Sequence, residues 1–151
     1  MLRRAWMFML GGRKVISGSW PLYRICMLML TISGAFQLIT GKVPGSVSAT
    51  NSPEWTDIVY MWMQFLGGAV TLASLTIGWR DISAAMGIER VGAVLVAFSS
   101  LIYVMSVVDY NSGPPTSSGV WLVIGVGTYC AYRVFEISDT FREAERKRRE
   151  C

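Results

Sequence analysis

Four long stretches of the chain are almost free of charged residues, and the polar residues gather in the short segments between them. The apolar stretches cover residues 22–40, 58–79, 91–108 and 117–135. A helix needs about 20 mostly apolar residues to cross a bilayer, and each stretch meets that requirement. The last one is uncharged until Arg133, whose long side chain we expect to reach the membrane interface. The pattern predicts an all-α membrane protein with four transmembrane helices.

The segments between the stretches contain residues that break helices. Residues 41–57 combine glycine and proline with serine, threonine and asparagine, and residues 109–116 include two consecutive prolines. Residues 80–90 are less clearly broken: Asp81 or Ser83 is a candidate helix cap, and Gly87 is a candidate turn residue. Tryptophan and tyrosine recur near the ends of the apolar stretches, as in the aromatic belts of membrane proteins.

The two ends of the chain differ from the part between them. Residues 1–19 form a basic arm, which is either interfacial or disordered. Residues 20–135 form the transmembrane domain. Residues 136–151 form a charged tail, and no glycine or proline follows Gly127, so the fourth helix is expected to continue into this tail.

The basic residues predict the orientation. The arm and the start of the first span hold five of them, residues 80–90 hold two and the C-terminal end holds six, whereas the other two loops hold only Lys42. Because short cytoplasmic loops are rich in lysine and arginine, both termini are expected in the cytoplasm. The expected topology anchors are Arg3, Arg4, Arg13, Lys14, Arg80, Arg90, Arg133, Arg146, Lys147, Arg148 and Arg149.

The basic ends also predict the partners. Clusters of arginine beside a membrane span attract anionic lipid at the cytoplasmic face, and such a position favours lipid over nucleic acid as the partner. A secretory signal ending at residues 47–49 fits poorly, because more than 20 residues would precede its apolar run. The N-terminal segment is therefore expected to be retained.

The chemistry available to the chain is limited. The 151 residues include no histidine and only three cysteines, none of them in an outer loop or in a CxxC pair. No ionisable residue is expected deep within a span, which argues against a proton-coupled transporter. The sequence therefore predicts a protein that is not an enzyme and that has no catalytic, cofactor or metal site.

Mildly polar and small residues follow one face of the first two spans. They are Ser33, Gln37, Thr40, Gln64, Gly68, Thr71, Ser74 and Gly78. We call this set the polar stripe. Such residues either allow close packing between helices or line a wet lumen in an oligomer, and their spacing does not distinguish the two uses.

Small size, several spans, the basic start MLRR and the charged tail FREAERKRREC make the chain resemble holins. Holins are small phage proteins that accumulate in the inner membrane and then open lesions during lysis. The chain looks like the four-span membrane proteins of lysis gene groups in phages that infect actinobacteria. The resemblance implies a protein of the bacterial inner membrane that forms homo-oligomers and permeabilises that membrane. The alternative is a non-enzymatic accessory or regulatory protein that packs against a larger membrane complex.

Overall fold

The computed structural model describes residues 21–48, 54–77 and 82–150, and it is helical throughout these ranges apart from the connecting turns. The helices are α2 (Pro21–Thr40), α3 (Gly45–Ser48), α4 (Glu54–Ile77), α5 (Ile82–Asn111) and α6 (Ser118–Glu150). Four of them are long and apolar enough to cross a membrane. This confirms the prediction of an all-α fold with four candidate spans. No strand occurs in the described ranges.

The helix ends follow from local sequence. Pro21 occupies the first position of α2, where its missing N–H would have no partner in any case. Gly41 follows the last residue of α2 with φ 63°, a left-handed conformation that glycine adopts without strain. At the end of α5, Ser112 adopts the left-handed conformation with φ 51°. The backbone N–H of Ser112 donates to the Asp109 carbonyl, and the backbone N–H of Gly113 donates to the Val108 carbonyl. This pair of hydrogen bonds is a Schellman motif, and it ends α5 just before the two prolines.

Helix α5 begins earlier than the sequence predicted. Residues 80–90 were expected to form a loop and the third span to start at residue 91, but α5 begins at Ile82 and includes Glu89 and Arg90. Gly87 lies inside this helix and marks no turn. The hydropathy of the segment is low because of its charged residues, but it contains no proline to stop a helix. The fourth helix also extends beyond residue 135, as expected, and continues to Glu150.

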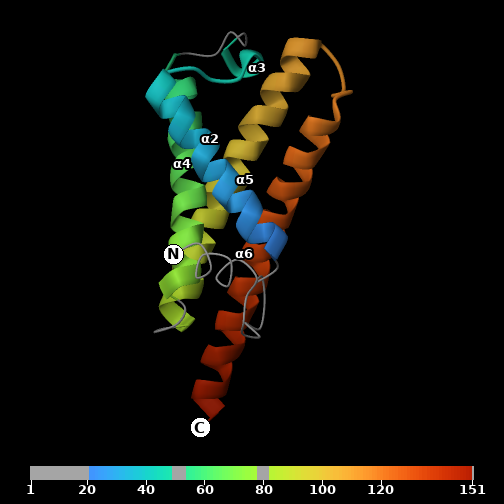
Figure 1. The fold of residues 1–151 in the computed structure, drawn as a ribbon. Coiled ribbons are helices and arrows are strands. Elements are labelled where there is room, and N and C mark those ends of the chain that lie inside the picture. The colour runs from blue at the N-terminus through green and yellow to red at the C-terminus, as the bar shows by residue number, and fades with distance from the viewer. Residues whose placement is uncertain (1–20, 49–53, 78–81, 151) are drawn as a thin grey trace.

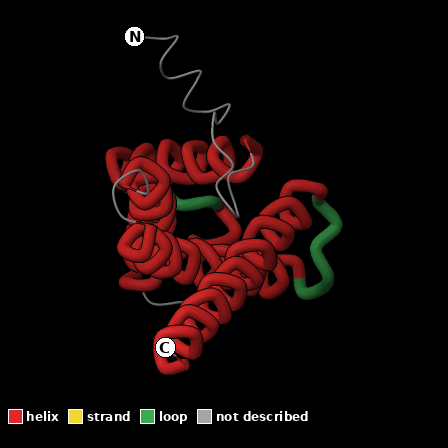
Figure 2. Tube along the Cα trace, turned by 90° about the horizontal axis from the view of Figure 1, so that it is seen from below, coloured by secondary structure: helices red, strands yellow, loops and turns green. Residues whose placement is uncertain are grey.

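Helix α4 packs against both α2 and α5, and α2 crosses in front of α5 in the view of Figure 1. Helix α6 packs against the far side of α5, and the short α3 also contacts α5. Seen from below, the helix that ends at the C-terminus runs obliquely past the others (Figure 2). Where α2 begins it also meets α6, since the rings of Tyr23 and Tyr129 are 5.2 Å apart.

Glycine allows α2 and α4 to approach closely. A Cβ atom at Gly34 of α2 would lie 2.7 Å from the backbone nitrogen of Phe65, and one at Gly68 of α4 would lie 2.9 Å from the carbonyl oxygen of Met27. Both contacts are with backbone atoms, which cannot turn away as a flexible side chain can. Any larger side chain at these positions would therefore push the two helices apart.

Glycine also allows α4 and α5 to approach closely. A Cβ atom at Gly67 would lie 2.9 Å from Cγ2 of Val96, and one at Gly92 would lie 2.8 Å from the backbone nitrogen of Thr71. Gly67 and Gly68 are consecutive but meet different helices, because successive residues on a helix point about 100° apart. The two glycines therefore bring α4 close to both of its neighbours.

We predict that Gly68→Leu destabilises the bundle, whereas Ala73→Leu on the same helix does not. The new side chain at position 68 would collide with the α2 backbone, and overpacking of this kind typically costs about 1–3 kcal/mol or more. Ala73 is exposed, so the same leucine there should change the free energy of unfolding by about 0.5 kcal/mol or less. The measurement is unfolding of the purified protein by a denaturing detergent, followed by circular dichroism. Equal destabilisation by the two variants would contradict this packing.

Candidate functional site

The first polar cluster of the bundle joins α2 to α4. The side-chain amide nitrogen of Gln37 donates to Oε1 of Gln64 at 3.2 Å and lies 3.2 Å from the hydroxyl of Ser33. Gln64 is buried and Gln37 is partly buried. We call these three residues the glutamine cluster. It contains the two bulkiest members of the predicted polar stripe, and in the structure they hydrogen-bond to each other within one chain.

The remaining stripe residues divide between the interior and the surface. Thr71 and Ser74 are buried and donate to backbone carbonyls of their own helix, those of Gly67 and Thr71. Gly68 packs against α2, whereas Thr40 is exposed and donates to a carbonyl one turn back. Gly78 lies outside the described residues. Most described members of the stripe therefore lie between helices of the same chain.

The second cluster is a buried group of charges between α5 and α6. Nε of Arg133 lies 2.8 Å from Oε1 of Glu89, and its Nη2 lies 3.2 Å from Oε2 of the same carboxylate. Nη1 of Arg133 lies 2.7 Å from Oε2 of Glu136, one turn along α6. The side chains of Arg133 and Glu89 are only 3% and 7% exposed. We call Glu89, Arg133 and Glu136 the ion-pair cluster.

The geometry of this cluster explains how the two charges tolerate burial. Transfer of an ion out of water costs several kcal/mol, and the attraction between the ions offsets that cost only when the geometry is good and the remaining donors are satisfied. Arg133 meets Glu89 through two parallel N–H···O contacts, the strongest arrangement for this pair, and Glu136 accepts from the third nitrogen. The cluster therefore joins α5 to α6 at the end of the bundle where α5 begins.

The sequence did not predict the ion-pair cluster. Glu89 belongs to the segment 80–90 that was expected to form a loop, but it lies inside α5. Arg133 lies in α6, where it was expected, and its side chain is buried against Glu89. Hydropathy alone cannot show this, because a helix that begins with charged residues looks like a loop. Because α5 begins before Glu89, this residue lies in the antiparallel α5–α6 hairpin, which brings it next to Arg133.

The other predicted anchors have different surroundings. Arg90 and Arg146 are exposed. The structure does not describe the side chains of Arg3, Arg4, Arg13, Lys14, Arg80, Lys147, Arg148 and Arg149. Among the residues that are described, no group of three or more cysteine, aspartate or glutamate side chains could hold a metal ion, and Cys26 and Cys130 are free thiols.

A third feature is an apolar face of α2 that no other described helix covers. Its members follow one another at alternating spacings of three and four residues, and all are at least 41% exposed: Leu22, Ile25, Met29, Ile32, Phe36 and Ile39. We call this row the α2 seam. Spacings of three and four residues keep side chains on one face of a helix, and a partner helix can pack against such a row at a small crossing angle.

The geometry of these features is the basis for assigning a function. No protein-family model, curated protein or solved structure matches the chain.

We predict that Glu89→Ala strongly destabilises the protein. It would leave the Arg133 guanidinium buried with Glu136 as its remaining carboxylate, and removal of one member of a buried pair typically costs about 3–5 kcal/mol. The matched control is Asp139→Ala, which removes one partner of the exposed Arg142–Asp139 pair and should cost about 1 kcal/mol or less. The double variant Glu89→Met, Arg133→Met should recover much of the loss, since it removes both charges. Equal stability of Glu89→Ala and Asp139→Ala in detergent unfolding would show that the cluster does not join the helices.

Proposed function

We propose that this chain acts by self-assembly in the bacterial inner membrane and that its assemblies permeabilise the membrane in the manner of a holin. The observation that supports this proposal is the α2 seam, a row of six apolar side chains left without a partner along the full length of α2. A second copy offers the same row, so two seams related by a two-fold axis would be self-complementary.

The position of α2 in the bundle supports its role in assembly. Among the described helices, α2 packs mainly on α4 and meets α6 only near its first turns. Helix pairs in membranes pack mostly with small left-handed crossing angles, as in coiled coils, and the spacing of the seam suits that geometry. Repeated contacts of this kind would gather copies in the membrane, which is the step that precedes lesion formation by holins.

A second candidate function rests on the glutamine cluster. Gln37 and Gln64 hydrogen-bond to each other inside one chain, so the most polar members of the stripe are already used in packing. A chain whose two glutamines bond to each other and whose α2 face is apolar is also suited to packing against another membrane protein. We therefore keep a non-enzymatic accessory protein of a larger membrane complex as the alternative.

The orientation that we propose has both termini in the cytoplasm. In the structure α2 begins, α4 ends and α5 begins at the same end of the bundle, and α6 extends beyond that end (Figure 1). We call it the basic end. Arg24 lies in the first turn of α2, Arg90 lies in the first third of α5, and Arg133 contacts Glu89 next to Arg90, with Arg142 further along α6. The asymmetry in basic residues along the chain supports placing this end inside the cell.

We predict that a cysteine at position 48 reacts with a membrane-impermeant thiol reagent in intact cells, whereas one at position 83 does not. Ser48 ends α3, at the end opposite the basic end, and Ser83 lies in the first turn of α5. The native cysteines are first replaced by serine so that only the new thiol reports. Opening the cells should expose position 83 to the reagent. Labelling of position 83 in intact cells would reverse the proposed orientation.

We predict that shortening the α2 seam delays permeabilisation. Met29→Ala together with Ile32→Ala removes bulk from the middle of the seam and should reduce both the cross-linked oligomers and the rate of dye entry after induction in a bacterial host. The matched control is Met105→Ala with Leu122→Ala, which removes similar bulk from exposed positions of α5 and α6. The amount of protein in the membrane is measured in parallel for each strain.

Three outcomes of this experiment separate the proposals. No dye entry from the unmodified protein at any expression level removes the holin-like function and leaves the accessory protein. Equal delay in the seam variant and its control excludes the α2 seam as the site of assembly. Loss of permeabilisation in a Gln37→Leu, Gln64→Leu variant at unchanged protein level would show that these residues line a lumen, because an interhelical hydrogen bond in lipid contributes only about 0.6 kcal/mol on average to stability.

A further inference from the structure

A groove runs between α5 and α6 along the face of the bundle that they share. It has a volume of about 560 Å³, and apart from the hydroxyls of Ser100 and Thr128 its walls are apolar. Small residues make it hollow: Ala97 and Ser100 of α5 face Gly127 and Ala131 of α6. A Cβ atom at Gly127 would lie 2.7 Å from Cβ of Ser100, so the two helices already touch at the floor of the groove.

The length of the groove matches one leaflet of a bilayer. On α5 it extends from Val94 to Val104, a separation of ten residue steps, which rise about 15 Å along the helix. The hydrocarbon core of a bilayer is about 30 Å thick, so one leaflet contributes about 15 Å. Phe98 and Leu101 form an exposed rim on the α5 side, and Phe135 forms one on the α6 side. A single acyl chain lying parallel to the helices would occupy such a groove.

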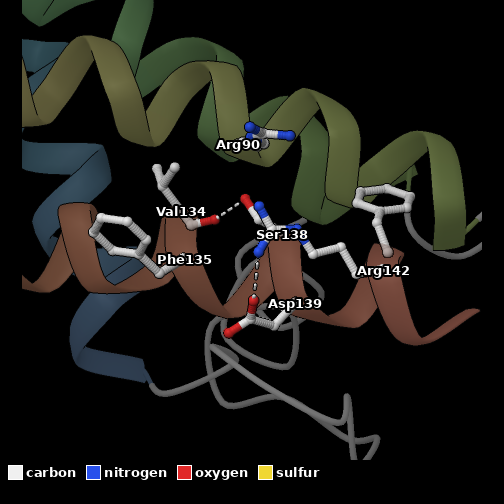
Figure 3. Close-up of a pocket in the computed structure, with 7 residues that line it drawn as sticks. Arg90, Val134, Phe135, Ser138, Asp139 and Arg142 are labelled. Atoms are coloured by element: carbon white, nitrogen blue, oxygen red, sulfur yellow. Dashed lines mark hydrogen bonds and ion pairs between the residues drawn. The ribbon is translucent and has the colours of Figure 1, made fainter.

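A second, polar pocket adjoins the groove at the basic end. Val134 and Phe135 line both hollows. The polar pocket has a volume of about 490 Å³, and Figure 3 shows Arg90 on α5 facing Ser138 across it, with Asp139 and Arg142 on α6. The apolar groove therefore ends close to the guanidinium groups of Arg90 and Arg142.

The charges of this pocket suit an anion. Arg90 is exposed, and it forms no ion pair within the described ranges. Arg142 lies 3.7 Å from Asp139, but both side chains are more than 70% exposed, and a pair of this kind is weak enough to exchange for another anion. The nearby carboxylate of Glu136 pairs with Arg133. At 100° per residue, Arg133 and Glu136 lie about 140° or more around the α6 axis from the centre of the face that lines the pocket.

We propose that the α5–α6 groove and the arginine pocket together form a binding site for one anionic phospholipid, with an acyl chain along the groove and the phosphate at Arg90 and Arg142. Arginine binds phosphate through several N–H donors at once, and basic pockets between transmembrane helices are known places for lipid head groups. The lipid belongs to the leaflet that faces the basic end of the bundle. This site does not depend on permeabilisation or on the α2 seam.

The test uses the full chain in lipid nanodiscs with two photoactivatable lipids, a phosphatidylglycerol and a phosphatidylcholine, each with a diazirine in the same acyl chain. Cross-linked residues are identified by mass spectrometry. We expect phosphatidylglycerol to label groove residues such as Leu101 and Phe135 several-fold more than phosphatidylcholine does. Equal labelling by the two lipids would overturn the head-group part of the proposal.

Variants locate the two halves of the site. Arg90→Gln and Arg142→Gln should each lower phosphatidylglycerol labelling of the groove about five-fold, since a basic residue near the membrane surface contributes about 1 kcal/mol. Arg146→Gln removes the same charge from an exposed position outside the pocket and should leave labelling unchanged. Equal loss with Arg146→Gln would reduce the effect to general surface charge. Arg90→Lys should keep part of the preference, since it retains the charge.

The groove itself is tested by filling it. Ala131→Leu should abolish groove labelling by both lipids, whereas Ala73→Leu adds the same bulk to an exposed position of α4 and should not. Labelling that survives Ala131→Leu would contradict the groove. A second copy of the chain is the competing occupant. If it fills the groove, lipid labelling is absent and Leu101→Cys cross-links between chains, in which case the lipid proposal is wrong.

Discussion

The close approach of α4 to its two neighbours is the constraint on which the rest of the bundle depends. Gly67 and Gly68 remove the side chains that would separate α4 from α5 and from α2. Because the helices touch at the backbone, Gln64 comes within hydrogen-bonding distance of Gln37, and Thr71 is enclosed against Gly92. In lipid no hydrophobic effect drives helices together, so close packing and a few hydrogen bonds must supply the stability. The glycine contacts provide the first and position the second.

The α5–α6 hairpin is held by different means at its two ends. At one end, the Schellman motif at Ser112 and the prolines after it fix where α5 stops, and the indole of Trp121 donates to the Pro115 carbonyl at the start of α6. At the other end, the bidentate contact between Arg133 and Glu89 fixes which faces of the helices meet. Between these points the small residues at Ser100 and Gly127 allow contact but do not by themselves select one register. The buried contact between Arg133 and Glu89 limits how α5 and α6 can meet, because displacement of either partner would leave an uncompensated buried charge.

The sequence predicted what the bilayer imposes and missed what the helices impose on one another. Four spans follow from hydropathy because a membrane requires length and apolarity of every crossing segment. Glu89 escaped prediction because its partner lies 44 residues away on another helix, and no local pattern records such a pair. Small residues follow one another along α4, yet Gly67 and Gly68 contact neighbouring helices whereas Ala73 is exposed. Which small residues contact a neighbour depends on how each helix is rotated about its own axis. A membrane span is apolar on all its faces, so its hydropathy pattern does not show which face points at another helix.

The α2 seam and the α5–α6 groove differ in the sizes of their side chains, and this difference determines what each surface can contact. Small residues are concentrated at internal contacts and in the α5–α6 groove, whereas the α2 seam is made of bulky side chains. A bulky row packs against another helix by interlocking side chains at a larger axial distance, and it cannot shelter a flexible chain along its length. The groove has alanine and glycine at its floor and larger apolar side chains along its rim, and this hollow shape suits a slender acyl chain. The seam is therefore suited to protein and the groove to lipid, so a copy assembled through α2 would still have its lipid site free.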